Sequence, residues 1–299
     1  MSKKLEGKTS SEWANMGMAH FESGKFQEAI NCFEKVIKVN PESGVIWSNM
    51  GVAYEKLGDY KKEIECCKKA IKIDPRDNWA WYNCGVGYGR LEKYENAIKC
   101  YKQALNIDSK DKHAWFNIGH AYRIIKDYDR AIESFEKALK YDSEYVKALK
   151  NLGYIYNEVG NYKKAIICYN DLIKLNPGDA VAWYNLGIAH FKLGRDRNAI
   201  EYYEQAVKIK PNYASAWNDM GFSYSNLGKY QKALECYEKA LNSEPNHTKA
   251  LFNLGVTHSN LGNYQNAIES LEKVCNIEPD NKEALVYLKK LKKKGFKDK

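Results

Sequence analysis

The eight cysteines and six histidines are the side chains of this chain best suited to bind a metal, form disulfides or act as nucleophiles. Five of the cysteines recur at multiples of 34 residues: Cys32, Cys66, Cys100, Cys168 and Cys236. Equivalent positions on stacked units of that length lie about 10 Å apart, beyond the roughly 7 Å between Cα atoms that a disulfide can bridge. No Cys-x2-Cys pair is present to indicate zinc. We therefore expect free, inert thiols in a reducing compartment, with no metal and no cofactor.

The histidines and the glycine-rich segment give no sign of catalysis either. His113 and His120 would share one helix face, but they would lie about two turns, or roughly 10.5 Å, apart, too far to hold one metal ion. Residues 85–90, GVGYGR, imitate a nucleotide-binding loop, yet they follow no predicted strand. We therefore predict no catalytic residue and expect that the protein is not an enzyme.

An asparagine series is the best candidate for a binding surface. It recurs every 34 residues at Asn15, Asn49, Asn83, Asn117, Asn151, Asn185, Asp219 and Asn253. Asparagine is a mediocre helix former, so helix stability does not explain it. A side-chain amide can bond the N–H and C=O groups of an extended peptide whatever its side chains, and a step of about 10 Å matches about three extended residues. Two alternatives stay open, namely hydrogen bonds between neighbouring repeats and recent duplication of one ancestral unit.

Aromatic residues flank this asparagine ladder. They stand one residue before it or three residues after it, at Tyr82, Phe116, Tyr184, Phe252, Tyr154 and Phe222. Such side chains suit a groove that also holds apolar side chains of a ligand. Aromatic residues are also common in helix packing, so we assign them to the predicted peptide-binding site only together with the ladder.

Helical hairpins must position these residues. A glycine recurs eight times at a spacing of 34 residues, which defines eight repeats at 10–43, 44–77, 78–111, 112–145, 146–179, 180–213, 214–247 and 248–281. Within each repeat, apolar residues recur at steps of three and four in two runs, as in two amphipathic helices. Small residues such as Gly187 and Ala199 stand where the two helices must cross closely, and Gly194 allows a left-handed turn between them. All six prolines occupy the thirty-second position of a repeat, where they end the second helix.

This frame, W-x2-L-G-x2-Y, then A-x3-F/Y, then P, resembles the tetratricopeptide repeat over more than nine tenths of the chain. The resemblance implies an all-α fold, a right-handed α-α superhelix whose first helices line a concave groove. Similar asparagine ladders line the repeat array of O-GlcNAc transferase and the armadillo groove of importin alpha, which implies binding of an extended segment. A clamp for C-terminal carboxylates is rejected, because Lys150 and Asn185 begin its pattern but Tyr154, Ser215 and Asp219 break it.

The second repeat departs from the frame at its twentieth position. Glu63 stands there, whereas the other seven repeats have alanine. We expect the carboxylate of Glu63 either to extend to water or to pair with a cation such as Lys56. Replacement of Glu63 by alanine is expected to raise the melting temperature, because a small residue suits the close helix crossing.

Segments with capping signals flank the array, and between them we expect it to be complete. In the N-terminal segment, residues 1–9, Thr9 precedes Glu12 by three residues and predicts a capping box. Residues 282–299 are predicted to form a capping helix, with Leu285, Leu288 and Leu291 on its apolar face, followed by a basic tail. Residues 280–283 are expected to cap that helix as Thr9 caps the first.

The formal net charge of +9 is concentrated in the flanking segments. Residues 282–299 carry +6 and residues 1–8 carry +2, which leaves +1 for the repeats. A nearly neutral array is a poor nucleic-acid groove, so we do not expect nucleic acid as a partner. The lysine-rich tail could contact anionic lipid or nucleic acid weakly, but solvated charge is the simpler interpretation. No apolar run approaches the roughly 20 residues of a membrane span and no signal peptide is evident, so we expect a cytoplasmic protein.

The sequence thus predicts a non-enzymatic interaction scaffold that binds an extended peptide or protein segment in its concave groove. The alternative is a structural assembly factor, or a targeting subunit of a larger complex, that acts through its convex face or its lysine-rich tail. The pattern indicates neither the identity of the partner nor an oligomeric state.

Overall fold

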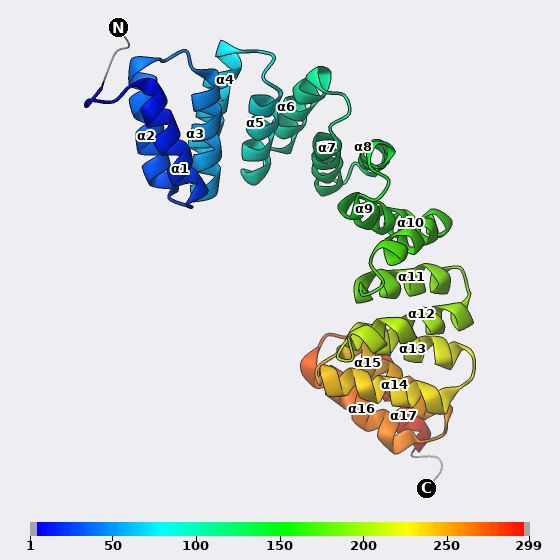
Figure 1. Cartoon of the computed structure of the whole chain (residues 1–299). Helices are drawn as coiled ribbons and strands as arrows, with labels where there is room; N and C mark the ends of the chain where they lie inside the picture. Colours follow the sequence, from blue (N-terminus) through cyan, green and yellow to red (C-terminus); the bar gives the residue numbers. More distant parts are fainter. Residues whose placement is uncertain (1–4, 296–299) are drawn as a thin grey trace. The chain divides into compact units, whose positions relative to one another are not determined.

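The computed structural model describes residues 5–295, and α-helices account for the regular structure of that part of the chain (Figure 1). The helices are α1 (Ser10–Glu22), α2 (Phe26–Val39), α3 (Gly44–Leu57), α4 (Tyr60–Ile73), α5 (Asn78–Arg90), α6 (Tyr94–Ile107), α7 (Lys112–Ile124), α8 (Tyr128–Tyr141), α9 (Val146–Glu158), α10 (Tyr162–Leu175), α11 (Ala180–Lys192), α12 (Asp196–Ile209), α13 (Ala214–Asn226), α14 (Tyr230–Ser243), α15 (Thr248–Asn260), α16 (Tyr264–Ile277) and α17 (Lys282–Gly295). Successive helices pair as hairpins, which confirms the predicted all-α array.

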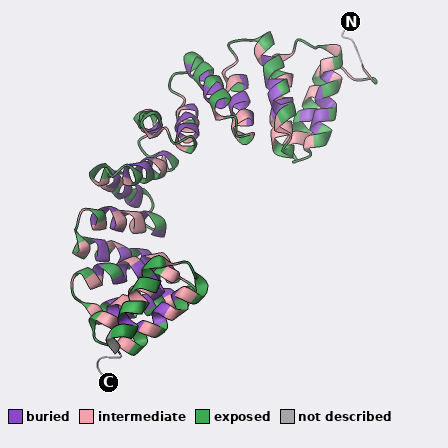
Figure 2. Cartoon of the chain, turned by 180° about the vertical axis from the view of Figure 1, so that it is seen from behind, coloured by how far each residue is buried: buried purple, intermediate pink, exposed green. Residues whose placement is uncertain are grey.

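The chain divides into two compact units, Met1–Asn151 and Leu152–Lys299, which are called unit 1 and unit 2 below. Each helix from α2 to α7 in unit 1, and from α11 to α16 in unit 2, packs against the helix before it and the helix after it. Buried residues lie on the helix faces that meet neighbouring helices (Figure 2). This is the arrangement expected when one hairpin cannot bury its own apolar face and is stabilised by the next.

The repeated glycine lies at the close crossing of the two helices in a hairpin, as predicted. In α11, a Cβ atom on Gly187 would stand 2.5 Å from Cε1 of Tyr203 in α12. Tyr203 and Ala199 are fully buried in the same helix pair. Only glycine therefore lets the tyrosine ring lie flat against the first helix.

The predicted left-handed turn between the two helices is also present. Gly194 has φ +71°, and the same position is a positive-φ glycine in five other repeats. Glu92 and Lys126 occupy it in the third and fourth repeats with φ of 58° and 62°. A side chain is strained in this conformation, so these two turns hold less favourable residues than the other six.

Tryptophan joins consecutive repeats through a hydrogen bond that the sequence did not indicate. Nε1 of Trp183 in α11 donates to the backbone oxygen of Pro177 at 2.9 Å, and Trp217 makes the same bond to Pro211 at 2.7 Å. Equivalent bonds start from Trp47, Trp81 and Trp115. The indole thus satisfies a carbonyl group at the end of the preceding repeat.

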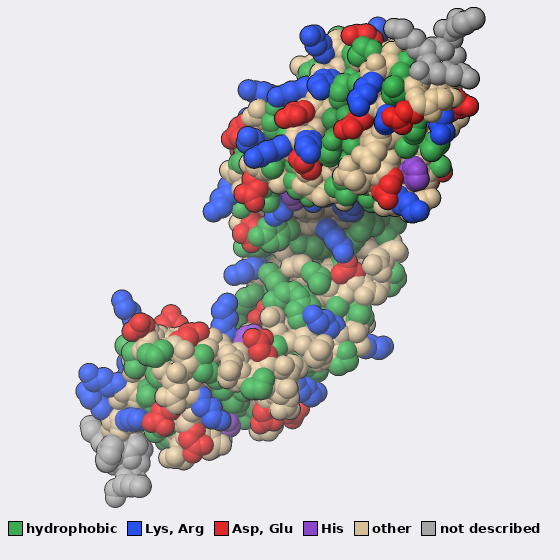
Figure 3. Space-filling view, turned by 90° about the vertical axis from the view of Figure 1, so that its left-hand side faces the viewer, with side chains coloured by type: hydrophobic (Ala, Val, Ile, Leu, Met, Phe, Trp, Pro, Cys, Tyr) green, Lys and Arg blue, Asp and Glu red, His purple; other side chains and the backbone are tan. Residues whose placement is uncertain are grey.

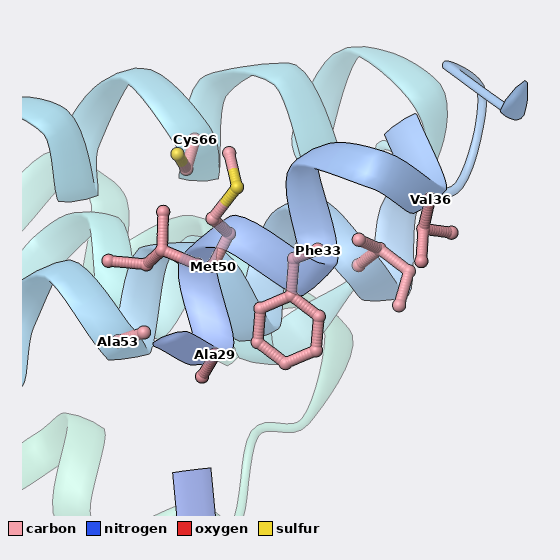
Figure 4. Packing of buried hydrophobic residues seen from close by; sticks show 8 residues of the cluster. Ala29, Phe33, Val36, Met50, Ala53 and Cys66 are labelled. Atoms are coloured by element: carbon pink, nitrogen blue, oxygen red, sulfur yellow. The ribbon is translucent and has the colours of Figure 1, made fainter. Parts of the chain in front are cut away.

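The core of unit 1 shows how adjacent hairpins interlock (Figure 4). Ala29, Phe33 and Val36 of α2 pack against Met50 and Ala53 of α3. All five are almost fully buried. Small residues alternate with large ones, so the second helix of one repeat fits closely against the first helix of the next.

Glu63 does not behave as predicted, because its carboxylate neither reaches water nor forms an ion pair. The residue is 1% exposed in α4, and its Oε2 atom is buried with no hydrogen-bond partner within the described residues. Oε2 lies 3.0 Å from the place where a Cβ atom on Gly87 of α5 would stand. Burial, reinforced by Glu55, raises the pKa of Glu63 to about 8. The carboxyl is therefore mostly protonated at neutral pH.

The first predicted cap is confirmed and the last is partly wrong. Thr9 and Glu12 form the reciprocal capping box at α1. At α17 the side chain of Asn281 accepts from the backbone N–H of Ala284 at 3.0 Å, so a single amide caps this helix. Leu291 is buried against α16, but Leu285 is 45% exposed and does not belong to the packed face. The tail beyond residue 295 lies outside the described residues.

All eight cysteines are free thiols, as expected from the sequence, and seven of them are buried. Burial raises the pKa of Cys66 and of Cys236 to about 12, so these thiols are protonated and unreactive at neutral pH. Among the helices of residues 5–295, none is long and apolar enough to cross a membrane.

Candidate peptide-binding cleft

A cleft of about 950 Å³ opens in unit 1 along the first helices of successive repeats. Its lining comes mainly from α3, α5, α7 and the first half of α9, with Tyr94, Ala97 and Tyr101 of α6. Three ladder residues, Asn83, Asn117 and Asn151, lie in this lining together with Tyr82 and Phe116. The hairpins thus bring together ladder and aromatic residues that the sequence separates by 34.

The three amides differ in how they are bonded. Nδ2 of Asn117 donates to Oη of Tyr82 in the preceding repeat at 3.0 Å, and Nδ2 of Asn151 donates to the backbone oxygen of Lys147 at 2.8 Å. Asn83 is only 7% exposed, yet its Nδ2 has no partner within the described residues. An unsatisfied buried amide is costly, so Asn83 is the residue of this series that most needs a ligand or water.

The other two ladder residues of unit 1 lie outside the lining of this cleft. Asn15 is exposed on α1. Nδ2 of Asn49 lies 3.4 Å from the sulfur of Met18, a weak acceptor. The amide of Asn15 thus faces solvent and that of Asn49 contacts α1, and neither lines the cleft of unit 1.

In unit 2 the ladder forms side-chain bonds between repeats. Oη of Tyr184 donates to Asp219 at 2.8 Å, and Nδ2 of Asn253 donates to Oδ1 of Asn218 at 3.0 Å. Nδ2 of Asn218 in turn donates to Asp219 at 2.9 Å. Asn185 is half-buried in α11. Bonds between neighbouring repeats, one of the two alternatives to peptide contact, thus account for part of this series.

The aromatic residues of the candidate site divide between the surface and the helix packing. Phe116 contacts the rings of Phe135 and Tyr145, with centroids 5.5 and 5.3 Å away, so much of it belongs to the core. Tyr154 and Phe222, in contrast, are 43% and 40% exposed. The remaining predicted aromatic, Phe252, is half-buried and packs on the ring of Tyr287.

Trp79 is a cleft residue that sequence reasoning did not single out. It is 56% exposed and stacks on Tyr82, with centroids 5.9 Å apart and an angle of 16° between the planes. It is the one tryptophan outside the repeated position, and that departure from the frame was the available signal. An exposed indole beside a polar cleft suits the apolar side chain of a ligand.

Charged residues at the cleft are mostly cationic, which the near-neutral charge of the array did not indicate. The lining contains Lys56, Arg90, Arg123, Lys147 and Lys150 against Glu55 and Glu92. Lys56 forms an ion pair with Glu55 at 3.1 Å. Burial, and then the charge of Arg123, lowers the pKa of His120, so that imidazole is neutral at pH 7.

Two neighbouring clefts of unit 2 have more acidic than basic side chains, whereas two other clefts of that unit have more lysines than acidic residues. A cleft of about 540 Å³ contains Asp219, Glu278, Glu283 and a single cation, Lys249. Burial raises the pKa of Asp219, although hydrogen bonds from Tyr184 and Asn218 oppose the shift. A smaller cleft of about 300 Å³ beside it adds Glu244. On the face seen in Figure 3, by comparison, acidic and basic side chains are interspersed.

Within residues 5–295 no three histidine, cysteine or acidic side chains gather closely enough to hold a metal ion. His113 bonds Tyr145 through Nδ1 at 3.2 Å, and His120 lies 3.3 Å from the guanidinium group of Arg123. The glycine-rich segment 85–90 lies inside α5 and forms no loop.

The chain belongs to the tetratricopeptide repeat family. Family models described as tetratricopeptide repeat match residues 10–43, 45–77, 113–145, 180–213 and 212–278, and a model described as TPR repeat matches 88–123 and 153–194. Among curated proteins, none matches the chain significantly.

Similar solved structures include YrrB, described as a TPR protein with an unusual peptide-binding site. It is 26% identical, and the TM-score is 0.55 over 64% of this chain and 99% of YrrB. The MamA protein is also 26% identical, with a TM-score of 0.55 over 58% of this chain and 96% of MamA. The Cut9–Hcn1 hetero-tetramer of the APC/C is 18% identical, with a TM-score of 0.55 over 89% of this chain and 52% of that one, and it resembles this chain in fold alone.

Proposed function

We propose that the protein is a non-enzymatic interaction scaffold that binds an extended peptide segment in the cleft of unit 1. The observation that carries the proposal is the unpartnered amide of Asn83, which is almost fully buried in the lining of a cleft of about 950 Å³. The similarity to YrrB, a protein described as having a peptide-binding site, supports the same class of function.

The remaining amides of the cleft can contribute even where one of their hydrogens is already bonded. An asparagine side chain has two N–H hydrogens and an oxygen with two lone pairs. Asn117 and Asn151 each use one hydrogen in the bonds described above. Their oxygen atoms and second hydrogens remain available to the backbone of a ligand. Trp79 and Tyr82 would then hold an apolar side chain of the same segment.

Substitution of the three cleft amides tests the proposal. Peptides are first selected from a random display library on the full chain, and the tightest is labelled for fluorescence anisotropy. The variant N83A/N117A/N151A is then compared with N96A/N170A/N198A, which removes three exposed asparagines of second helices. At about 0.5 to 1.5 kcal/mol for each hydrogen bond, the cleft variant should bind about ten to a thousand times more weakly.

The control variant should bind like the unchanged chain, and both variants should keep the helical circular dichroism spectrum. Equal affinity of the cleft variant and the control would refute peptide binding at the ladder. Unfolding of the cleft variant would instead favour the structural alternative for the amides. The single variant N83A then decides between them, because Asn83 makes no side-chain bond through Nδ2 that a substitution could break.

An assembly role through the end of the array is the second candidate. It is favoured by the exposed apolar residues of α17, since Leu285 and Val286 are 45% and 55% exposed. They lie near Lys289 and Lys292 on the same helix. The variant L285S/V286S should lose a partner captured through this face while peptide binding in unit 1 persists. Loss of both activities, or of neither, would count against a separate docking face.

A further inference from the structure

The cleft of unit 1 has a net positive charge, although the repeat array as a whole is nearly neutral. Five lysine and arginine side chains line it against two glutamates, whereas a cleft of about 540 Å³ in unit 2 has one lysine against three acidic residues. A cleft with low-dielectric walls and charge of one sign raises the local concentration of ligands of the other sign. Such a ligand would not be drawn to the acidic clefts of unit 2.

Arg90 and Arg123 are the cations best placed to bind the acceptor groups of a ligand. Each lies in the last turn of a first helix, α5 or α7, where a cation also interacts favourably with the helix dipole. The dipole does not explain why Nε of Arg123 is buried without a partner within the described residues. With Nδ2 of Asn83, it is the second unsatisfied donor in the same lining. Both donors require an acceptor, and a carboxylate offers two oxygens.

The spacing of the two arginines defines the spacing of the acceptors. They lie about one repeat apart along the array, or roughly 10 Å, which corresponds to about three residues of an extended chain. Lys147 and Lys150 continue the cationic lining at the start of α9. Hence acidic side chains at every third position could meet successive cations along one cleft.

We propose that the cleft of unit 1 selects extended peptide segments with acidic side chains three residues apart, bound by Arg90 and Arg123. The amides of Asn83 and Asn117 hold the backbone of the segment between these ion pairs. Trp79 accepts an apolar side chain next to the acidic ones. This inference rests on the proposed function and adds the chemistry of the ligand to it.

The test repeats the display selection on the full chain and determines the amino-acid composition of the selected peptides by sequencing them. Random segments of about 12 residues are long enough to span the cleft at roughly 3.3 Å per residue. Aspartate and glutamate should be enriched, with a maximum in pair frequency at a separation of three. A matched peptide in which glutamine replaces each glutamate should bind about tenfold more weakly, and the affinity of the acidic peptide should fall as salt screens the charges.

Two variants locate the selectivity. R90Q/R123Q should remove the acidic enrichment and bring the glutamate and glutamine peptides to equal affinity. R197Q is the matched control, because Arg197 is an exposed residue of α12 outside the cleft. It should leave both the enrichment and the salt dependence unchanged.

The outcomes separate the inference from the function on which it rests. Selected peptides that depend on the asparagines but have no acidic enrichment would overturn the inference and leave the proposed function standing. If no peptide is selected, both fail. Tighter binding of a labelled single-stranded oligonucleotide than of the acidic peptide, lost in R90Q/R123Q, would assign the cations to nucleic acid and also overturn the inference.

Discussion

The buried carboxyl of Glu63 should make the stability of unit 1 depend on pH. Burial raises its pKa from 4.5 to about 8 in the folded chain, so the folded state binds this proton more tightly than the unfolded state does. The folded state is therefore most stable below pH 4.5, and stability falls as the pH rises towards 8. The slope is about 1.4 kcal/mol per pH unit, so we expect a loss of about 3 kcal/mol between pH 5 and pH 7.

The variant E63Q isolates this effect because glutamine has nearly the same volume and no charge. Its melting temperature should rise relative to the unchanged chain as the pH increases, by roughly 5 °C between pH 5 and pH 7 at about 2 °C per kcal/mol. E65Q is the control, since Glu65 is exposed on the same helix. Amide hydrogen exchange in α4 and α5 should show the change locally. Parallel pH profiles of E63Q and E65Q would refute the assignment of a buried, unpaired carboxyl.

Gly87 gives this reasoning an independent check. The other seven repeats have alanine or a larger residue at its position, but a Cβ atom there would stand 3.0 Å from Oε2 of Glu63 and 2.9 Å from Cγ1 of Ile64. G87A alone should destabilise the chain, and the loss should be smaller when E63A is also present. A coupling energy near zero in this double-mutant cycle would mean that Glu63 does not determine the need for glycine.

Three further substitutions test the packing and the ladder. Gly187→Ala should lower the free energy of unfolding by about 1 to 3 kcal/mol, because its Cβ atom would overlap the second helix, and thermal denaturation measures this. Tyr184→Phe should raise the pKa of Asp219 by removing a donor to its carboxylate, so the loss of stability, about 1 to 3 kcal/mol, should be larger at pH 7 than at pH 4. Phe116→Tyr should supply a hydroxyl group to Asn151, as Tyr82 does for Asn117, and weaken peptide binding without lowering the melting temperature.

The fold could be predicted from the sequence because its period fixes so many positions at once. Gly187 had to face a close helix crossing and Gly194 had to end a helix, and the structure confirms both. Glu63 was misjudged because the repeat frame treats each hairpin separately. Its carboxyl packs against Gly87 of the next repeat, and a contact between repeats becomes visible only when their stacking is known.

The cationic cleft was missed for a related reason. Net charge sums over all faces of the array, and acidic residues outside the cleft, in both units, offset the cations around Arg90 and Arg123. The residues that supply charge to the cleft also vary from repeat to repeat, and a search for repeated residues passes over them. Trp79 was missed for the same reason, because it stands outside the repeated tryptophan position. Residues that recur in every repeat thus indicate what the fold requires. Residues that differ between repeats determine the charge and the exposed apolar surface of one cleft.

The asparagine ladder combines both kinds of position. Where a ladder residue bonds across repeats in this way, its partner is the fifth residue of the preceding repeat, and the chemistry of that partner decides whether the ladder side chain is used within the protein. Tyr82 accepts from Asn117, and Asn218 accepts from Asn253. The fifth residue of the repeat before Asn83 is Ser48, whose hydroxyl group instead donates to Asp77 at 3.1 Å.

Asn83 is thereby left with a buried, unsatisfied donor, although it is the same residue type in the same frame as its bonded counterparts. A repeated asparagine is compatible with a purely structural role only if each side-chain amide has a hydrogen-bond partner within the protein. Ser48 already donates to Asp77, so the series of bonds between repeats is interrupted at the wall of the cleft of unit 1. A ligand bound there would complete a hydrogen bond that the preceding repeat does not supply, and this links the local sequence difference to peptide binding.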